Sequence, residues 1–106
     1  MVFQLGSALL DACVLAVLSG GDEYGYVLTQ KVKEVIDISE SSLYPVLRRL
    51  KKEGCLTTFD RPFGGRNRRY YSITEQGRVK LKETSEEWKQ YKMKVDRILS
   101  GGIDNG

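Results

Sequence analysis

The feature that most constrains the fold is the stretch from Ser39 to Thr74, where an amphipathic segment precedes a β-rich one. In its first half, apolar residues recur at intervals of three and four, which predicts a helix over residues 41–53. These apolar residues are Leu43, Val46, Leu47 and Leu50. Because Pro45 has no backbone N–H, we expect it in the first turn, which favours a start at Ser41 or Ser42 over Ser39. Gly54 is expected just past the helix end.

The second half of this stretch predicts a two-stranded hairpin over residues 56–73. The segments CLTTF and RRYYSIT are rich in β-branched and aromatic residues, and RPFGGRN between them supplies Pro, two Gly and an Asn. Between Arg48 and Arg69 there are eight basic and two acidic residues, a net charge of +6 against +3 for the whole chain. A basic helix followed by a basic hairpin is typical of a winged helix-turn-helix that binds duplex DNA.

Composition narrows the class of protein. A chain of 106 residues with 41% hydrophobic and 29% charged residues is expected to form one globular domain. It has no histidine and no clustered carboxylates, so we expect neither an enzyme nor a metal or cofactor site. Cys13 and Cys55 are expected to be buried thiols of a cytoplasmic protein. No apolar run is long enough to span a membrane.

The residues before Ser39 predict two more helices. Leu5 to Ser19 is apolar almost all round and is expected to be a covered helix; the lack of a basic start and the presence of Asp11 argue against a signal peptide. Asp11 is expected either on a solvent-exposed strip or facing a wet cavity. A second helix is expected from Glu23 to Ile36. Helix, helix, short turn, helix and wing make the tri-helical core of a winged helix-turn-helix over residues 1–74.

A last helix is expected from Glu75 to about Leu99, capped by Thr74, and residues 100–106 are expected to be a loose tail. Its apolar residues follow a heptad spacing. One of the two apolar positions of the heptad is occupied by Leu81, Trp88 and Val95, and the other by Thr84, Tyr91 and Ile98. The helix could pack on its own domain. However, a helix of 25 residues, with a rise of ~1.5 Å per residue, is longer than a small winged core. We therefore favour the alternative in which this helix pairs with that of a second copy in a homodimer. Leu9 is also expected in the interface.

The sequence resembles the PadR family of transcriptional regulators, in the short branch that ends in a single helix. The matching residues run in order along the chain: Tyr24-Gly25-Tyr26, Ser42 to Leu50, Glu53-Gly54, Gly65, Arg68 to Tyr71, Ile73-Thr74 and Gly77. The resemblance implies a mainly α fold with a two-stranded wing. It also implies a homodimeric repressor that binds a two-fold symmetric operator.

Members similar to this chain include multidrug-sensing regulators, in which a tryptophan of the last helix stacks on flat aromatic drugs. Trp88 stands at the matching place, although it could equally be a dimer-core residue. The same resemblance implies ligand contacts from the first helix at Leu5, Ala8, Asp11 and Ala12. Relatives that prefer cations carry an acid one turn beyond the tryptophan, where this chain has Lys92, so a charge for a cationic ligand would have to come from Asp11.

If the chain binds DNA, each basic and polar residue has an expected role. Ser41, Ser42, Tyr44 and Pro45 would enter the major groove, and Arg48, Arg49 and Lys52 would pair with phosphates. Arg66, Arg68 and Arg69 of the hairpin would contact the backbone or the adjacent minor groove. Strand alternation places Arg68 and Arg69 on opposite faces, so only one of them is expected to reach DNA. Two other functions stay open: a protein–protein interaction module, and a drug-binding sink with little DNA role.

Overall fold

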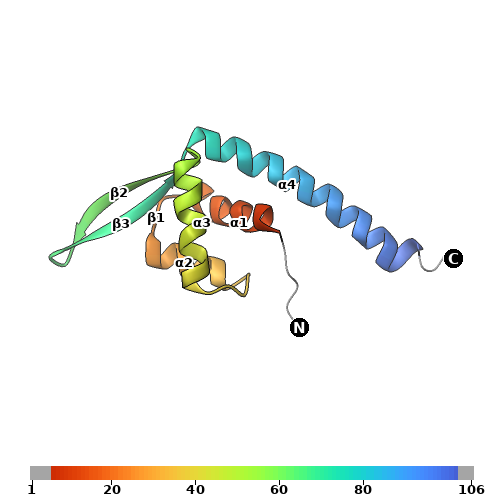
Figure 1. Cartoon of the computed structure of the whole chain (residues 1–106), viewed down its shortest axis with the longest axis horizontal. Coiled ribbons are helices and arrows are strands. Elements are labelled where there is room, and N and C mark those ends of the chain that lie inside the picture. Colours follow the sequence, from red (N-terminus) through yellow and green to blue (C-terminus); the bar gives the residue numbers. More distant parts are fainter. Residues whose placement is uncertain (1–5, 103–106) are drawn as a thin grey trace.

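The computed structural model describes residues 6–102, in which three helices and a small sheet pack together and a long fourth helix extends away from them (Figure 1). The helices are α1 (Ser7–Ser19), α2 (Gly25–Lys33), α3 (Glu40–Lys52) and α4 (Glu75–Asp96). The strands are β1 (Glu23–Tyr24), β2 (Leu56–Phe63) and β3 (Arg66–Ile73). The molecule measures 64 × 30 × 21 Å, and its long axis runs from the β2–β3 hairpin at one end to α4 at the other (Figure 1). The predicted winged helix-turn-helix with a long C-terminal helix is confirmed.

The wing has a third strand that the sequence pattern did not indicate. The sheet is antiparallel with the order β1-β3-β2, and Glu23 and Tyr24 pair with Tyr71 and Tyr70 of β3. The prediction that the second helix begins at Glu23 is therefore wrong: α2 begins at Gly25 and ends at Lys33. Gly25 is buried against the ring of Tyr71, and this close approach fixes where the strand turns into the helix.

The start of α3 also differs from the prediction. Ser39 is the N-cap, and its hydroxyl accepts a hydrogen bond from the Ser42 backbone N–H at 3.2 Å. Pro45 therefore lies inside the helix, beyond the first turn, so the favoured start at Ser41 or Ser42 is wrong. The side-chain cap at Ser39 offsets the one backbone bond that Pro45 cannot make to the carbonyl of Ser41.

The end of α3 is as predicted. Gly54 has a positive φ of 82°, and the N–H groups of Gly54 and Cys55 donate to the carbonyls of Lys51 and Leu50. This is the Schellman arrangement, in which a left-handed residue satisfies the last carbonyls of a helix. It turns the chain sharply into β2.

The apolar core lies between α1, α2, α3 and the start of β2. Its largest fully buried side chains come from all four elements and are Leu15, Leu18, Leu28, Leu43, Leu47, Leu50 and Leu56. Tyr71, Ile73 and Leu81 pack against this core from β3 and α4. The predicted apolar stripe of α3 is therefore the face that packs into the core. The side chains on the other side of this helix face outward.

The long helix α4 begins at Thr74, whose hydroxyl accepts from the Gly77 N–H at 3.0 Å, as predicted. Its first turns pack on α1, and Gly77 is its only buried residue. Beyond Asp96 the chain continues as a wider π-helical turn, Arg97–Gly102, so residues 100–102 are part of the rod and not of the expected tail. Residues 103–106 lie outside the described part of the chain.

Candidate nucleic-acid interface

The outer face of α3 carries the polar and basic residues predicted for DNA contact, with one exception. Leu43, Leu47 and Leu50 anchor the inner face. On the outer face, exposed side chains follow the whole length of the helix: Ser41, Ser42, Tyr44, Pro45, Arg48, Lys51 and Lys52. The hydroxyls lie in the N-terminal half and the cations in the C-terminal half. The exception is Arg49, which is half-buried and points elsewhere.

A groove runs between α3 and the hairpin, and basic side chains from both elements line it. Arg48, Lys51 and Lys52 come from α3, Arg69 comes from β3, and Thr58 and Tyr71 form the floor. Lys51 was not among the predicted contact residues. Its spacing of three from Arg48 was the available signal, because residues three apart lie on the same helix face.

A second concave surface continues this groove past the start of α2. Tyr26 and Tyr44 lie on it with Asn67, Arg68 and Arg69 of the hairpin. Tyr26 is well exposed, although nothing in the sequence pattern marked it as a contact residue. Tyr71 lies where both surfaces meet, and burial raises the pKa of its hydroxyl above the ordinary value, so the phenol stays neutral at physiological pH.

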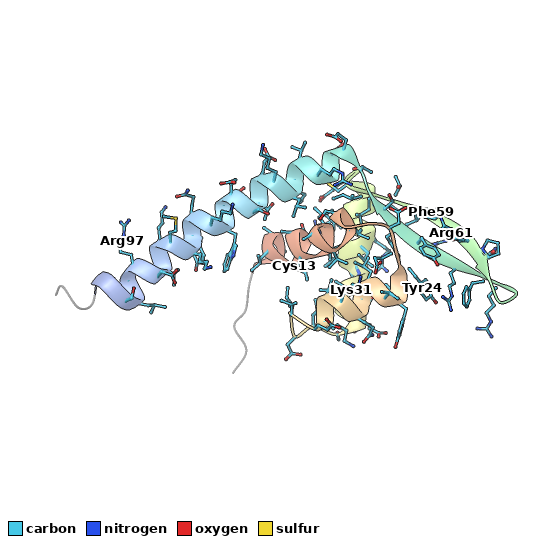
Figure 2. The ribbon with its side chains drawn as sticks, turned by 180° about the vertical axis from the view of Figure 1, so that it is seen from behind. Cys13, Tyr24, Lys31, Phe59, Arg61 and Arg97 are labelled. Atoms are coloured by element: carbon cyan, nitrogen blue, oxygen red, sulfur yellow. The ribbon has the colours of Figure 1, made fainter. Side chains whose placement is uncertain are left out.

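The opposite face of the hairpin is built differently. Arg68 lies over the rings of Phe63 and Tyr24, with 3.6 and 4.6 Å between its guanidinium carbon and the ring centroids. Arg61 lies 5.1 Å from the rings of both Phe59 and Tyr70, which stack on each other. Figure 2 shows Phe59, Arg61 and Tyr24 along this side. Guanidinium–aromatic contacts of this kind stiffen the hairpin.

The two neighbouring arginines of β3 therefore have different surroundings, as strand alternation predicts. Arg68 is held in the aromatic stack, whereas Arg69 is exposed in the groove, where its nearest acid is Asp60 at 3.5 Å. At the hairpin tip, Gly64 and Gly65 both have positive φ and form a two-residue turn. Arg66 follows directly and is exposed.

Arg49 pairs with Asp11 on the inner side of α3. Two guanidinium nitrogens lie 2.5 and 3.0 Å from the two carboxylate oxygens of Asp11, which is only 3% exposed. The expectation that Asp11 lies on a solvent-exposed strip is therefore wrong, because the side chain is buried. A buried carboxylate needs a cationic partner, and this requirement turns Arg49 away from the outer face. Unlike Arg48, Arg49 is committed to a structural pair.

Two further charged groups complete this cluster. Lys80 of α4 lies 3.4 Å from Asp11 and 3.2 Å from Glu53, and Glu53 lies 3.3 Å from Arg49. We call Asp11, Arg49, Glu53 and Lys80 the four-charge ring. The hydrogen bond to Asp11 raises the pKa of Arg49, and the hydrogen bond from Lys80 lowers the pKa of Glu53. Burial opposes the charge on Lys80, but its bond to Glu53 and the charge of Asp11 outweigh burial and raise its pKa.

The residues predicted for a ligand are spread over α1 and α4. Trp88 is 38% exposed, with its ring centroid 6.2 Å from that of Tyr91. Ala8 is exposed and Ala12 is buried, whereas Leu5 lies outside the described residues. Asp11 is matched by Arg49 and Lys80, so it offers no free charge to a cationic ligand.

The residues predicted for a dimer interface differ in exposure along the molecule. Tyr91 and Ile98, in the distal half of the rod, are 62% and 64% exposed. Val95 is half-buried, as are Leu81 and Leu9 nearer the winged half. The start of the last helix therefore packs on its own domain, whereas its distal half is bare within one chain, and the dimer stays a prediction.

Other kinds of site find little support in the part of the chain that the structure describes. Within residues 6–102 there is no group of three or more potential metal ligands. Cys13 and Cys55 are free, and burial raises the pKa of both thiols, which makes them poor nucleophiles. Over the same residues, no helix combines the length and the apolar character needed to cross a bilayer.

Comparison with known proteins identifies the fold's relatives. Residues 14–83 match the model of the Transcriptional regulator PadR-like family, which covers α1 to the first turns of α4. The chain belongs to the PadR-like family. That family consists of transcriptional regulators.

Individual relatives agree with this membership. The chain is 39% identical to smu.1704 from Streptococcus mutans, with a TM-score of 0.87 and 95% of each chain covered. It is 32% identical to a PadR-like transcriptional regulator from Bacillus cereus, with a TM-score of 0.79 over 88% of this chain and 93% of the other. It is also 35% identical to the transcriptional regulator Rv3488 from Mycobacterium tuberculosis, over 66% of each protein.

Proposed function

We propose that this PadR-like protein is a homodimeric repressor that binds a two-fold symmetric operator through α3 and the β2–β3 hairpin. The observation that carries the proposal is the groove in which Arg48, Lys51 and Lys52 of α3 lie beside Arg69 of β3. Cations from two elements that converge on one concave surface suit the phosphate backbone, which supplies most of the affinity in protein–DNA complexes.

The N-terminal half of α3 is the part that reads bases. Ser41 and Ser42 present hydroxyls, and Tyr44 and Pro45 present apolar surface, all of them exposed and without a basic neighbour in that half of the helix. Hydroxyls bond base edges or phosphates, and apolar groups contact thymine methyls in the major groove. The cations of the C-terminal half hold the flanking phosphates.

The hairpin contacts the DNA beside the site read by α3. Arg66 is exposed next to the Gly64-Gly65 turn, and the guanidinium–aromatic stack on Arg61 and Arg68 keeps the two strands extended. In this arrangement Arg66 reaches the backbone or the minor groove, and Arg69 faces the same duplex from the groove. Arg49 makes no phosphate contact, because Asp11 and Glu53 hold its guanidinium.

The distal half of α4 pairs with the same helix of a second copy. Large apolar side chains on one face of the distal rod have no cover within one chain: Trp88 and Tyr91 of α4, and Ile98 and Leu99 of the turn that follows it. Such a contiguous exposed apolar face marks an interaction surface. A symmetric pair of rods presents two copies of α3, which must lie about one DNA turn apart, ~34 Å, or a multiple of it.

A flat aromatic effector stacked at Trp88 would release the DNA by changing how the two rods meet. Since Asp11 is neutralised by Arg49 and Lys80, we expect neutral planar ligands to bind no worse than cationic ones of the same shape. This step is tested by adding neutral and cationic planar dyes to the protein and measuring the quenching of Trp88 fluorescence. Absence of quenching at high micromolar dye would leave Trp88 as a packing residue.

The salt dependence of DNA binding tests the main proposal. Duplexes selected by the wild-type protein from a random pool serve as probes, and binding is measured by fluorescence anisotropy at several salt concentrations. The double variant Arg48→Ala, Arg66→Ala should reduce the slope of log K against log salt by about 3.6, because the dimer loses two phosphate contacts in each protomer and each lost contact removes ~0.9 from the slope. Arg78→Ala on α4 is the control and should leave the slope unchanged.

The same experiment separates the alternatives. An unchanged slope in the double variant would remove Arg48 and Arg66 from the contact surface. If the wild type binds no duplex even in dilute salt, the proposal fails, and a protein–protein module or a ligand-binding sink becomes the better account.

A further inference from the structure

The four-charge ring is positioned to do more than satisfy one buried carboxylate. Its members come from three helices: Asp11 from α1, Arg49 from α3 with Glu53 at the end of that helix, and Lys80 from α4. Around the ring the charges alternate, and each acid contacts both bases, at 2.5 to 3.4 Å. A closed arrangement of this kind holds all three helices in one relative orientation, because any of them that moves breaks two contacts.

A second set of contacts already joins the end of α3 to the start of α4. The Thr74 hydroxyl donates to the carbonyl of Gly54 at 2.6 Å, and the Gln76 amide donates to the carbonyl of Glu53 at 2.8 Å. Gly77 packs so closely on the backbone of Cys55 that an added Cβ would overlap the carbonyl oxygen. These contacts fix where α4 begins, and the direction of the helix is set by the contacts that its next turns make with α1.

Lys80 supplies the second point of attachment. It lies one turn beyond Thr74–Gly77, so its contacts with Asp11 and Glu53 constrain the direction in which α4 leaves the winged half. Beyond Lys80, Leu81 packs against the core and α4 continues along α1, and only its distal part extends well past the winged half (Figure 1). The direction set at Lys80 therefore decides where the distal, apolar part of the rod meets its partner.

We propose that the four-charge ring fixes the angle between α3 and α4 and thereby sets the half-site spacing that the dimer accepts. This inference rests on the proposed function, since spacing has meaning only for a dimer on a two-fold operator. It assigns Asp11, Arg49 and Lys80 as positioning residues, which act on DNA through α3 and touch no nucleotide themselves.

The test compares Lys80→Gln with Lys82→Gln. Both variants remove one lysine charge from α4; Lys80 belongs to the ring, and Lys82 is exposed and makes no ion pair among residues 6–102. Each is bound to a series of duplexes that carry the two half-sites selected by the wild type, with one or two base pairs inserted or deleted between them. The full-length protein is used, and binding is again measured by anisotropy.

We expect the wild type and K82Q to lose at least tenfold in affinity for each wrong spacing. The affinity of K80Q should fall less than threefold over the same series of spacings. Its affinity for duplexes of random sequence should fall no further than that of K82Q. Asp11→Asn should flatten the series in the same way. A change in overall stability would scale all duplexes together, so the flattening is specific to positioning.

A measurement without DNA checks the geometric step. Residual dipolar couplings report the orientation of α4 relative to α1 and α3, and K80Q should show reduced couplings on α4 only. A spacing series for K80Q as steep as that of the wild type, or a wild type without spacing preference, would overturn the inference and leave the proposed function standing. Unfolding of both K80Q and D11N would also overturn it, because the ring would then provide stability and not orientation. A wild type that binds no duplex would instead be the failure of the proposed function.

Discussion

The helices α1 and α4 differ in how much of their surface the chain itself covers. Of the 13 residues of α1, five are buried, including the charged Asp11. Of the 22 residues of α4, only Gly77 is buried, and the distal apolar side chains are open to solvent. The winged half is therefore packed within one chain, whereas the distal rod is left uncovered by its own chain. Loss of a side chain should affect folding in the first region and assembly in the second.

The largest expected effect comes from the core of the winged half. Leu15→Ala removes a fully buried side chain of α1 and should lower the free energy of unfolding by about 4 kcal/mol at any protein concentration. Leu99→Ala, the same change at a residue that is 68% exposed, should alter the unfolding of the winged half by less than about 0.5 kcal/mol. Urea unfolding followed by circular dichroism measures both. Equal losses would break the comparison.

The next effect separates two adjacent arginines of α3. Arg49→Met leaves the buried carboxylate of Asp11 with Lys80 alone and should cost roughly 3 kcal/mol of folding free energy. Arg48→Met, at an exposed neighbour, should stay within about 0.5 kcal/mol. The same urea titrations apply. A stable R49M protein would mean that the Asp11 pair contributes nothing net to folding.

A smaller effect is expected on assembly. Tyr91→Ala removes an exposed aromatic ring from the rod and should weaken dimerisation about tenfold, or about 1.4 kcal/mol, with the winged half still folded. Gln90→Ala, which changes an exposed polar neighbour outside the heptad seam, should leave the dimer unchanged. Sedimentation equilibrium distinguishes them. Identical dissociation constants for the two variants would exclude the distal rod as the interface.

The smallest expected effect is on the stability of the protein at acidic pH. The pKa of Glu53 is lowered in the folded protein by its bonds to Lys80 and Arg49, so its contribution to stability is present above its ordinary value of 4.5 and is lost as the pH falls below that value. Melting temperatures recorded from pH 7 to pH 3 should therefore fall less steeply for Glu53→Gln than for the wild type in the acidic part. Parallel curves would show that the ring does not involve Glu53 in solution. The raised pKa values of Arg49 and Lys80 keep both groups charged throughout this range.

Much of the winged fold could be predicted from local pattern. The apolar spacing of α3, the Gly54 end, the Gly64-Gly65 turn and the Thr74 cap are each decided by residues a few positions apart, and all are present. The strand β1 could not be predicted from the local sequence pattern. Its two residues continue into a helical pattern, and only pairing with Tyr70 and Tyr71 far along the chain makes them a strand.

The predicted interface was incomplete for a similar reason. Arg48 and Arg49 are indistinguishable in the sequence of α3, and their roles separate only because Asp11, 38 positions earlier, is buried beside one of them. A lone acid in an otherwise apolar helix was the available signal, since it must find a cation when the helix is covered. The DNA and ligand contacts themselves stay predictions, which the experiments above test.

The close packing at Gly77 has a mechanical consequence. About 29 Å of helix lies beyond this glycine, so a tilt of about 10° at that point carries the far end of α4 through roughly 5 Å. That displacement exceeds the ~3.4 Å rise of one base pair. In the proposed dimer, a tilt of about 7° at Gly77 would therefore be enough to shift one half-site contact by a full base pair relative to the other.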